Sequence, residues 1–386
     1  MTATDDPIVA NPLTITDAAA ALRAGTTTSV ELVQACLDRA DAVDEQLGVF
    51  LARFDDDALT AAAAADAELA AGQDRGPLHG IPIGVKDIIA SKEGPTTAQS
   101  LVLDPAWAGS EDAVVVERLR EAGAIVVGKA ATLEFAIGIA DPDKPFPIHR
   151  NPWDPDRWPG GSSAGTGSGV AAGCFLGGLG TDTGGSVRIP AAFCGITGLK
   201  ATHGRVPKSG CVPLGYSLDH IGPMARSASD REAMLAVMAG HHPSDPTSAL
   251  SPQAGASEGG MLPPPSLDGV RLGVDWANHL DGPNVRAEAV TVLEAAVDTL
   301  GELGAEVVEV EIPHYAEGNV ADILIMVCEA ASYHARDLQD RWSDYGSPTR
   351  KILTWAAAYS SADYVQAQRL RRLVARETNE LLDTVD

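Results

Sequence analysis

The feature that most constrains this 386-residue chain is a glycine-rich stretch with interspersed hydroxyl groups at residues 158–200. It contains Pro-Gly-Gly-Ser-Ser at 159–163 and Gly-Thr-Asp-Thr-Gly-Gly-Ser at 180–186. Glycine adopts backbone angles that other residues avoid, so such a stretch can turn tightly and bring consecutive N–H groups close to one ligand atom. The end of the second run can therefore present converging donors to an oxyanion, beside a serine hydroxyl.

Four interpretations of this stretch follow from the residues. A phosphate-binding loop is disfavoured because the chain has no G-x-x-x-x-G-K-[ST] motif and the glycines at 165–169 lack the dinucleotide spacing. Residues 161–165 match G-x-S-x-G, but that motif follows a strand directly, whereas residues 151–159 contain three prolines. The other two interpretations are a structural turn and a serine nucleophile whose base is not histidine.

A second feature is the apolar run at residues 81–85, which follows a turn and ends in Lys86. On residue type alone, a lysine at the end of such a run is most often solvated. Lys129 ends another apolar run, residues 124–128, whose composition is typical of a buried strand. The residue types by themselves therefore do not distinguish a catalytic lysine from a structural one.

Both regions resemble the amidase signature family. The matching runs keep the order of that family's motifs and lie at residues 76–87, 159–163, 180–195, 198–200, 204–206 and 217–226. The chain departs from the usual residues at Ala164, Thr166 and Ala201, without losing a hydroxyl or amine that the chemistry needs. The resemblance implies an α/β fold in which α-helices cover both faces of a mixed, twisted central β-sheet, as a single domain over residues 1–386.

The resemblance also implies a Ser-Ser-Lys triad. It places the nucleophile at Ser186 and the catalytic base at Lys86. Between them it places Ser162, which follows a cis peptide bond and relays the proton. A lysine has a reference pKa of about 10.4, so a lysine base must be desolvated to be neutral near pH 7, and the apolar run before Lys86 is a source of such desolvation.

Further site residues follow from the same resemblance. Backbone N–H groups are expected to form the oxyanion hole, at Thr183, Gly184, Gly185 and Ser186. Three neighbouring residues are expected to support the site, namely Ser163, Asp182 and Arg188. A pairing of Arg188 with Asp182 is favoured over contact between Arg188 and the substrate. Lys129 and His79 are expected to be structural.

The predicted activity is hydrolysis of a carboxylic amide through a serine acyl-enzyme, with no cofactor and no metal. One alternative in the same family is the A subunit of the glutamyl-tRNA(Gln)/aspartyl-tRNA(Asn) amidotransferase, a glutaminase with the same triad. The runs at 188–190 and 213–217 favour a stand-alone amidase. A catalytically inactive scaffold is the alternative from another class of function. The sequence does not determine the acyl group or the leaving amine.

Composition bears on partners and location. The formal net charge is −25, which disfavours nucleic acid and anionic membrane as partners. The resemblance implies a small-molecule amide as the partner, and a homodimer is left open. The five cysteines form no C-x-x-C pattern, so the sequence indicates neither a disulfide framework nor a zinc site. The cytoplasm is the expected location.

Local patterns predict several elements. Helices are expected within residues 14–72, where residues 28–31 have the form of a capping box, and at 166–174. A strand–helix–strand pattern at residues 270–312 predicts a parallel crossover. A long surface loop is expected at 243–268. The chain ends directly after a helix expected at about 362–384, where family members usually continue with a strand, so a truncated C-terminus is expected.

Overall fold

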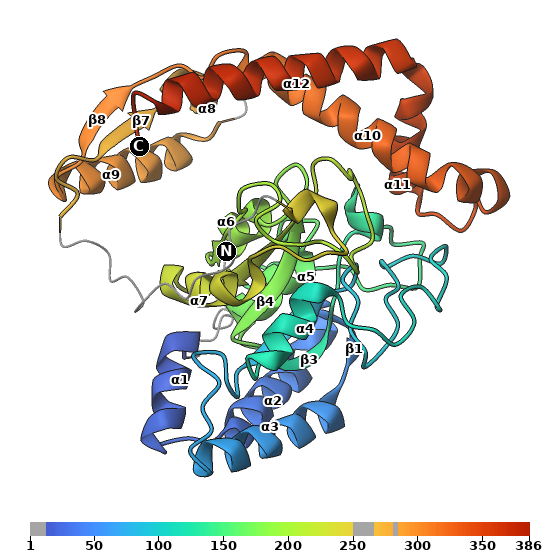
Figure 1. Cartoon of the computed structure of the whole chain (residues 1–386). Coiled ribbons are helices and arrows are strands. Elements are labelled where there is room, and N and C mark those ends of the chain that lie inside the picture. The colour runs from blue at the N-terminus through green and yellow to red at the C-terminus, as the bar shows by residue number, and fades with distance from the viewer. Residues whose placement is uncertain (1–12, 250–265, 281–284) are drawn as a thin grey trace. The chain divides into compact units, whose positions relative to one another are not determined.

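The computed structural model (Figure 1) describes residues 13–249, 266–280 and 285–386. The chain divides into two compact units. Unit 1 comprises residues 1–258 and 329–355, and unit 2 comprises residues 259–328 and 356–386. The long helix α10, Tyr315–Asp340, begins in unit 2 and ends in unit 1.

Unit 1 contains a sheet, the helices that flank it and short 3-10 turns. Its strands are β1 (Phe50–Arg53), β2 (Pro82–Lys86), β3 (Ile125–Ala130), β4 (Gly177–Asp182), β5 (Thr197–Gly198) and β6 (His220–Ala225). Its helices besides the end of α10 are α1 (Ile15–Ala24), α2 (Ser29–Leu47), α3 (Asp55–Ala70), α4 (Val114–Glu121), α5 (Ala164–Ala172), α6 (Arg188–Cys194), α7 (Ala228–Met238) and α11 (Ser347–Trp355). The 3-10 turns are η1 (Glu134–Ala136) and η2 (Pro246–Ser248).

The sheet has six strands in the order β1-β3-β2-β4-β6-β5. Strand β2 runs parallel to both of its neighbours, β3 and β4. The outer pairs β1–β3, β4–β6 and β5–β6 are antiparallel, so the sheet is mixed. A mixed sheet flanked by helices confirms the predicted α/β fold class. Because β2 and β4 are parallel, their carboxyl ends meet at one edge of the sheet, where polar side chains gather.

Helix α5 packs closely enough against its neighbours that it requires glycine. A Cβ atom on Gly165 would lie 2.4 Å from the carbonyl oxygen of Val49, and one on Gly169 would lie 2.3 Å from the Phe175 ring. Every residue of this helix is buried. Its start is thereby held next to strands β2 and β4, which places the serines that precede it beside the ends of those strands.

The helices predicted within residues 14–72 are present as α1, α2 and α3, but residues 50–53 form strand β1, so the helical prediction is wrong there. Thr28 and Glu31 form the capping box at the start of α2, and Gly48 ends that helix in the left-handed region. Buried apolar side chains of α2, α3, β3 and α5 form one core cluster together with Phe175. The predicted helix at 166–174 corresponds to α5, which begins two residues earlier.

Unit 2 contains the predicted crossover. Strands β7 (Arg271–Val274) and β8 (Glu306–Glu309) pair in parallel and are connected through α9 (Ala287–Glu302). The unit also contains α8 (Trp276–His279), the 3-10 turn η3 (Ala356–Ala358) and α12 (Ser361–Leu382). Most of the surface loop predicted at 243–268 lies outside the described residues.

Candidate active site

Lys86 and three hydroxyl groups form a buried cluster at the carboxyl end of β2. The Lys86 side chain is fully buried. Its Nζ is hydrogen-bonded to Ser162 Oγ at 2.7 Å, to Ser163 Oγ at 3.0 Å and to Thr181 Oγ1 at 2.7 Å. The serines come from the segment before α5, and Thr181 comes from the adjacent strand β4. The structure thus brings three of the predicted residues together and adds Thr181, which the sequence analysis did not identify.

The surroundings of Lys86 favour its neutral form. Burial lowers the pKa of Lys86 to about 7, although the carboxyl groups of Asp182 and Asp219 act in the opposite direction. All three hydrogen-bond partners of Nζ are hydroxyls, and no carboxylate of the described residues pairs with this amine. Near neutral pH the amine can therefore exchange a proton with a bonded hydroxyl, as a general base must.

The segment that carries Ser162 has the backbone geometry that the resemblance implies. The Gly161–Ser162 peptide bond is cis. A Cβ atom on Gly161 would lie 2.8 Å from Leu133 Cδ1 and 3.0 Å from the Trp158 ring, so a larger residue here would require these side chains to shift. The predicted cis peptide is confirmed.

Ser186 lies in the turn between β4 and α6. Its carbonyl oxygen accepts from the backbone N–H of Ser163 at 3.3 Å, so the turn lies beside the serine pair. The Ser186 side chain is half-buried, and its hydroxyl makes no hydrogen bond within the described residues. Contacts between catalytic groups are often loose before a substrate binds, so this geometry is compatible with a nucleophile.

Asp182 organises the turn that follows β4. It is buried and accepts from the backbone N–H of Gly185 at 2.8 Å and of Val187 at 3.2 Å. The Arg188 guanidinium donates to both of its oxygens, at 3.0 and 2.9 Å, which is the pairing that the sequence analysis favoured. Burial alone would raise the pKa of Asp182, but the bonds from Arg188 and the turn hold it below its ordinary value. Asp182 is therefore ionised, and its carboxylate oxygens hold the turn through these hydrogen bonds.

The same contacts distinguish the candidate oxyanion donors. The Gly185 N–H is already bonded to Asp182. In the described part of the chain, the N–H groups of Thr183, Gly184 and Ser186 have no hydrogen-bond acceptor. These three groups are therefore free to bind an oxyanion, while Gly185 maintains the turn at a φ of 128°.

Asp219 is a residue of the site that the sequence analysis did not single out, although it lies in the matching run at 217–226. It accepts from Thr183 Oγ1 at 2.6 Å and from the backbone N–H groups of Leu214 and Gly215, each at 3.0 Å. Burial raises its pKa. Asp219 connects the loop before β6 to the turn that carries the oxyanion donors.

A cavity of about 250 Å³ adjoins this cluster. Thr181 and Thr183 form its border with the cluster. Its apolar walls include Ile88, Val212, Pro213, Leu214 and Ile221, and its polar lining includes Lys208, Cys211, Tyr216, Asp219 and Asp245. Burial raises the pKa of Cys211 to about 12, so this thiol is neutral near pH 7. The cavity has the mixed apolar and polar lining of a small-molecule site.

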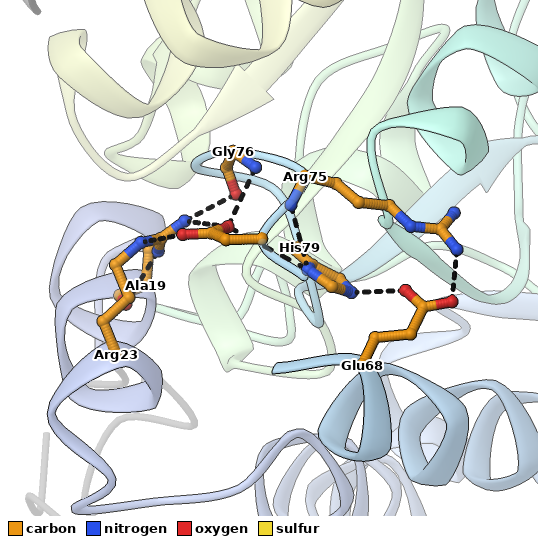
Figure 2. A network of polar contacts seen from close by, with 7 residues as sticks. Ala19, Arg23, Glu68, Arg75, Gly76 and His79 are labelled. Carbon is orange, nitrogen blue, oxygen red and sulfur yellow. Dashed lines mark hydrogen bonds and ion pairs between the residues drawn. The ribbon is translucent and has the colours of Figure 1, made fainter. Parts of the chain in front are cut away.

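His79 lies in a different network, shown in Figure 2. Its Nδ1 accepts from the backbone N–H of Arg75 at 3.2 Å, and its Nε2 lies 3.1 Å from a carboxylate oxygen of Glu68 in α3. Arg23 of α1 donates to the carbonyl oxygen of Gly76 at 2.8 Å. These contacts fasten the turn that leads into β2 to helices α1 and α3. His79 thus makes structural contacts.

Two further observations concern metals and membranes. Within residues 13–249, 266–280 and 285–386, no group of three or more His, Cys, Asp or Glu side chains is arranged to hold a metal ion. Among the same residues, no helix combines the length and the apolar character that crossing a bilayer requires.

Comparisons with known proteins agree with this architecture. A family model described as Amidase matches residues 31–386. The chain is 40% identical to the A subunit of a glutamyl-tRNA(Gln) amidotransferase from Chloroflexus aurantiacus, over 97% of this chain and 80% of that protein. It is also 40% identical to an amidase of Pseudomonas putida, over 97% of this chain and 78% of that protein. The crystal structure of a peptide amidase from Stenotrophomonas maltophilia superposes with a TM-score of 0.78 at 31% identity, covering 94% of this chain and 79% of that one.

Proposed function

The chain belongs to the amidase family of amidohydrolases, and from this premise we propose that it hydrolyses a carboxylic amide through an acyl-enzyme on Ser186. The observation that carries the proposal is the buried Lys86 amine, whose hydrogen-bond partners among the described residues are all hydroxyls and whose pKa is about 7. A neutral serine hydroxyl is a weak nucleophile and needs an adjacent base. Lys86 can supply that base through Ser162.

In the proposed acylation, neutral Lys86 takes the proton of Ser162 while Ser162 takes the proton of Ser186. The Ser186 oxygen then bonds to the amide carbon, and the carbonyl oxygen becomes an oxyanion. We assign the N–H groups of Thr183, Gly184 and Ser186 as its donors, because they have no acceptor within the described residues. Such pre-positioned donors are often the largest single contribution to catalysis of acyl transfer.

The remaining steps return the protons. The C–N bond breaks as the proton held by Lys86 passes back through Ser162 to the leaving nitrogen, which departs as ammonia or an amine. Water then attacks the acyl-serine, gives its proton to the same relay and releases the carboxylic acid. Ser186 regains its hydroxyl hydrogen, and the cycle uses only the amide and one water.

We also propose supporting roles for the residues around the triad. Asp182 and Arg188 maintain the turn that follows β4. Ser163 and Thr181 hold the Lys86 amine in place from two sides. Units 1 and 2 together are proposed to form one amidase domain, since the family model spans both. The cytoplasm remains the proposed location.

A screen for ammonia release over aliphatic, aromatic and amino-acid amides tests this proposal. At least one amide should be hydrolysed, and mass spectrometry after trapping with a slow ester should find the acyl group on the peptide that contains Ser186. The Ser186→Ala variant should neither turn over the substrate nor acquire the label. An acyl group on Ser162 or Ser163 instead would refute the assigned nucleophile.

A second candidate function is that of the A subunit of a glutamyl-tRNA(Gln) amidotransferase. It is supported by the 40% identity to the Chloroflexus aurantiacus protein, which equals the identity to the Pseudomonas putida amidase. A protein of this kind would release ammonia from glutamine and would need partner subunits. A glutaminase assay with and without the partner subunits of that enzyme distinguishes the two candidates.

An inactive scaffold is the remaining alternative. It is disfavoured because every position of the triad carries a competent side chain and Lys86 contacts Ser162. Labelling by a fluorophosphonate, which reacts with activated serines, separates the scaffold from both enzymes. Absence of a label on the folded chain would favour the scaffold.

A further inference from the structure

Ser162 is held at its backbone as well as at its hydroxyl. Its carbonyl oxygen accepts two hydrogen bonds, from the backbone N–H of Leu133 at 3.2 Å and from Thr132 Oγ1 at 3.1 Å. Both donors come from the segment that directly follows β3. Thr132 is fully buried, so its hydroxyl cannot replace this partner with water.

Thr132 is itself held from two other directions. Its backbone N–H donates to Gln99 Oε1 at 3.0 Å. Its carbonyl oxygen lies 2.8 Å from His149 Nε2, and the other ring nitrogen of His149 lies 3.2 Å from the carbonyl oxygen of Gly48. Gln99 and His149 are both buried. The contacts of Thr132 therefore connect Ser162 to Gln99 and to His149, and through His149 to Gly48.

From these contacts we infer that Thr132 is a positioning residue for the relay, and this inference rests on the proposed function. The Ser162 hydroxyl is joined to the backbone by a single methylene, so its place depends on where the backbone lies. The hydrogen bond from Thr132 Oγ1 fixes the carbonyl group of Ser162. The Ser162 Oγ atom is thereby held 2.7 Å from Lys86 Nζ. A misplacement of about 1 Å in a reacting group can lower a rate about a hundredfold.

The inference assigns the effect to the hydroxyl of Thr132 rather than to its packing. Replacing threonine by valine keeps the branched shape and removes the donor. Replacing it by serine keeps the donor and removes a methyl group, and replacing it by alanine removes both. The three substitutions together separate the hydrogen bond from the volume of the side chain.

A matched control exists in Thr166 of helix α5. Its side chain is also fully buried, and its Oγ1 donates to the carbonyl oxygen of Leu179 at 3.0 Å. That bond joins α5 to β4 and does not involve Ser162. Thr166→Val therefore removes a buried bond of the same kind without touching the relay.

The experiment measures the rate of Ser186 labelling by a fluorophosphonate as a function of probe concentration, together with the melting temperature of each variant. Thr132→Val should lower the maximal labelling rate about tenfold or more and leave the half-saturating probe concentration within about twofold. Thr132→Ser should label within about threefold of the wild-type rate, and Thr132→Ala should be as slow as Thr132→Val. Thr166→Val should keep the wild-type labelling rate even if it melts earlier.

Several results would overturn the inference. A folded Thr132→Val that labels as fast as wild type would show that the hydroxyl has no positioning role. Equal slowing by Thr132→Val and Thr166→Val would mean that the effect is one of general packing. If Thr132→Val does not fold, the serine and alanine variants decide, because equal rates for those two exclude a role for the hydroxyl. A wild-type chain that is not labelled at all would instead refute the proposed function.

Discussion

Lys86 is the last residue of strand β2 and Lys129 is the penultimate residue of the neighbouring strand β3, and both side chains are fully buried. Burial lowers the pKa of each. Their partners differ, because Lys129 lies 3.5 Å from a carboxylate oxygen of Asp87, whereas the hydrogen-bond partners of Lys86 in the described part of the chain are hydroxyls. A carboxylate stabilises an ammonium group, so Lys129 makes a structural ion pair. The neighbours of each lysine, and not its burial, thus indicate which one can act as a base.

Replacement of Lys86 should abolish catalysis. Lys86→Ala should lower kcat by about three orders of magnitude or more, as the loss of the base does in other serine hydrolases. Lys86→Arg should be nearly as damaging, because arginine does not deprotonate in this range. The wild-type rate should rise with pH along one deprotonation with a midpoint near 7, because the amine is a base only when neutral. Steady-state kinetics across pH provide the measurement.

The matched control is the same substitution at the second lysine. Lys129→Arg keeps a positive charge beside Asp87 and should keep the ascending limb of the pH profile, even if the larger side chain lowers the melting temperature. If Lys86→Arg retained most of the activity with an unchanged pH profile, Lys86 would not be the base.

At the scale of elements, helix α5 is the part of the fold that most directly sets the site. It is made of small buried residues, and it begins immediately after the serine pair. Because its glycines allow backbone-to-backbone contact, the helix lies close enough to the sheet for Lys86 to reach both serines. The position of the site therefore depends on glycines in α5, because any larger residue there would push the helix away from its neighbours.

Gly165→Ala should destabilise the protein and disturb the site together. The added Cβ would lie 2.4 Å from the Val49 carbonyl oxygen and 2.5 Å from the Ala131 nitrogen, and backbone atoms cannot move aside individually. We expect a loss of about 1–3 kcal/mol or more in the free energy of unfolding, measured by urea denaturation. The fluorophosphonate labelling rate should fall as well.

The control for this helix is Gly301→Ala in α9. There the nearest atom to an added Cβ is 3.8 Å away, in a side chain, so the substitution makes an ordinary contact. Alanine favours helix over glycine, so this variant should be neutral or slightly stabilised. Equal destabilisation by both substitutions would mean that close packing of α5 is not the cause.

At the scale of the whole molecule, charge is the dominant property. The chain carries 53 acidic and 28 basic residues, so like charges repel one another over its surface. Many of its ion pairs join exposed side chains, such as Arg336 with Asp340, and such pairs contribute little to stability. Repulsion should therefore outweigh these local attractions.

Added salt should accordingly stabilise the protein. Raising sodium chloride from about 0.1 M to about 1 M shortens the Debye length from about 10 Å to about 3 Å and screens the repulsion. The melting temperature should rise over this range, as differential scanning calorimetry would show. Potassium chloride should have the same effect, since screening depends on ionic strength. A fall in melting temperature would instead indicate that the exposed ion pairs dominate.

The sequence by itself determined the features that depend on neighbouring residues. The capping box of α2 and the parallel crossover of β7 and β8 follow from local patterns, because capping and periodicity act over a few residues. The triad positions came from the resemblance, and the contacts of Asp219 and Thr132 were not predicted. Those contacts join residues far apart in the chain, such as Thr183 with Asp219, and no local pattern marks them.

The resemblance placed the base at Lys86, but only the tertiary structure shows why this lysine, and not Lys129, faces the serines. Lys86 and Lys129 each end a short apolar run, and sequence patterns describe both in the same way. The hydroxyls that surround Lys86 come from positions 76 to 95 residues further along the chain. They reach it because β2 and β4 are parallel neighbours and α5 packs against both strands. The chemistry of the lysine is therefore a consequence of strand order and helix packing, which only the assembled fold provides.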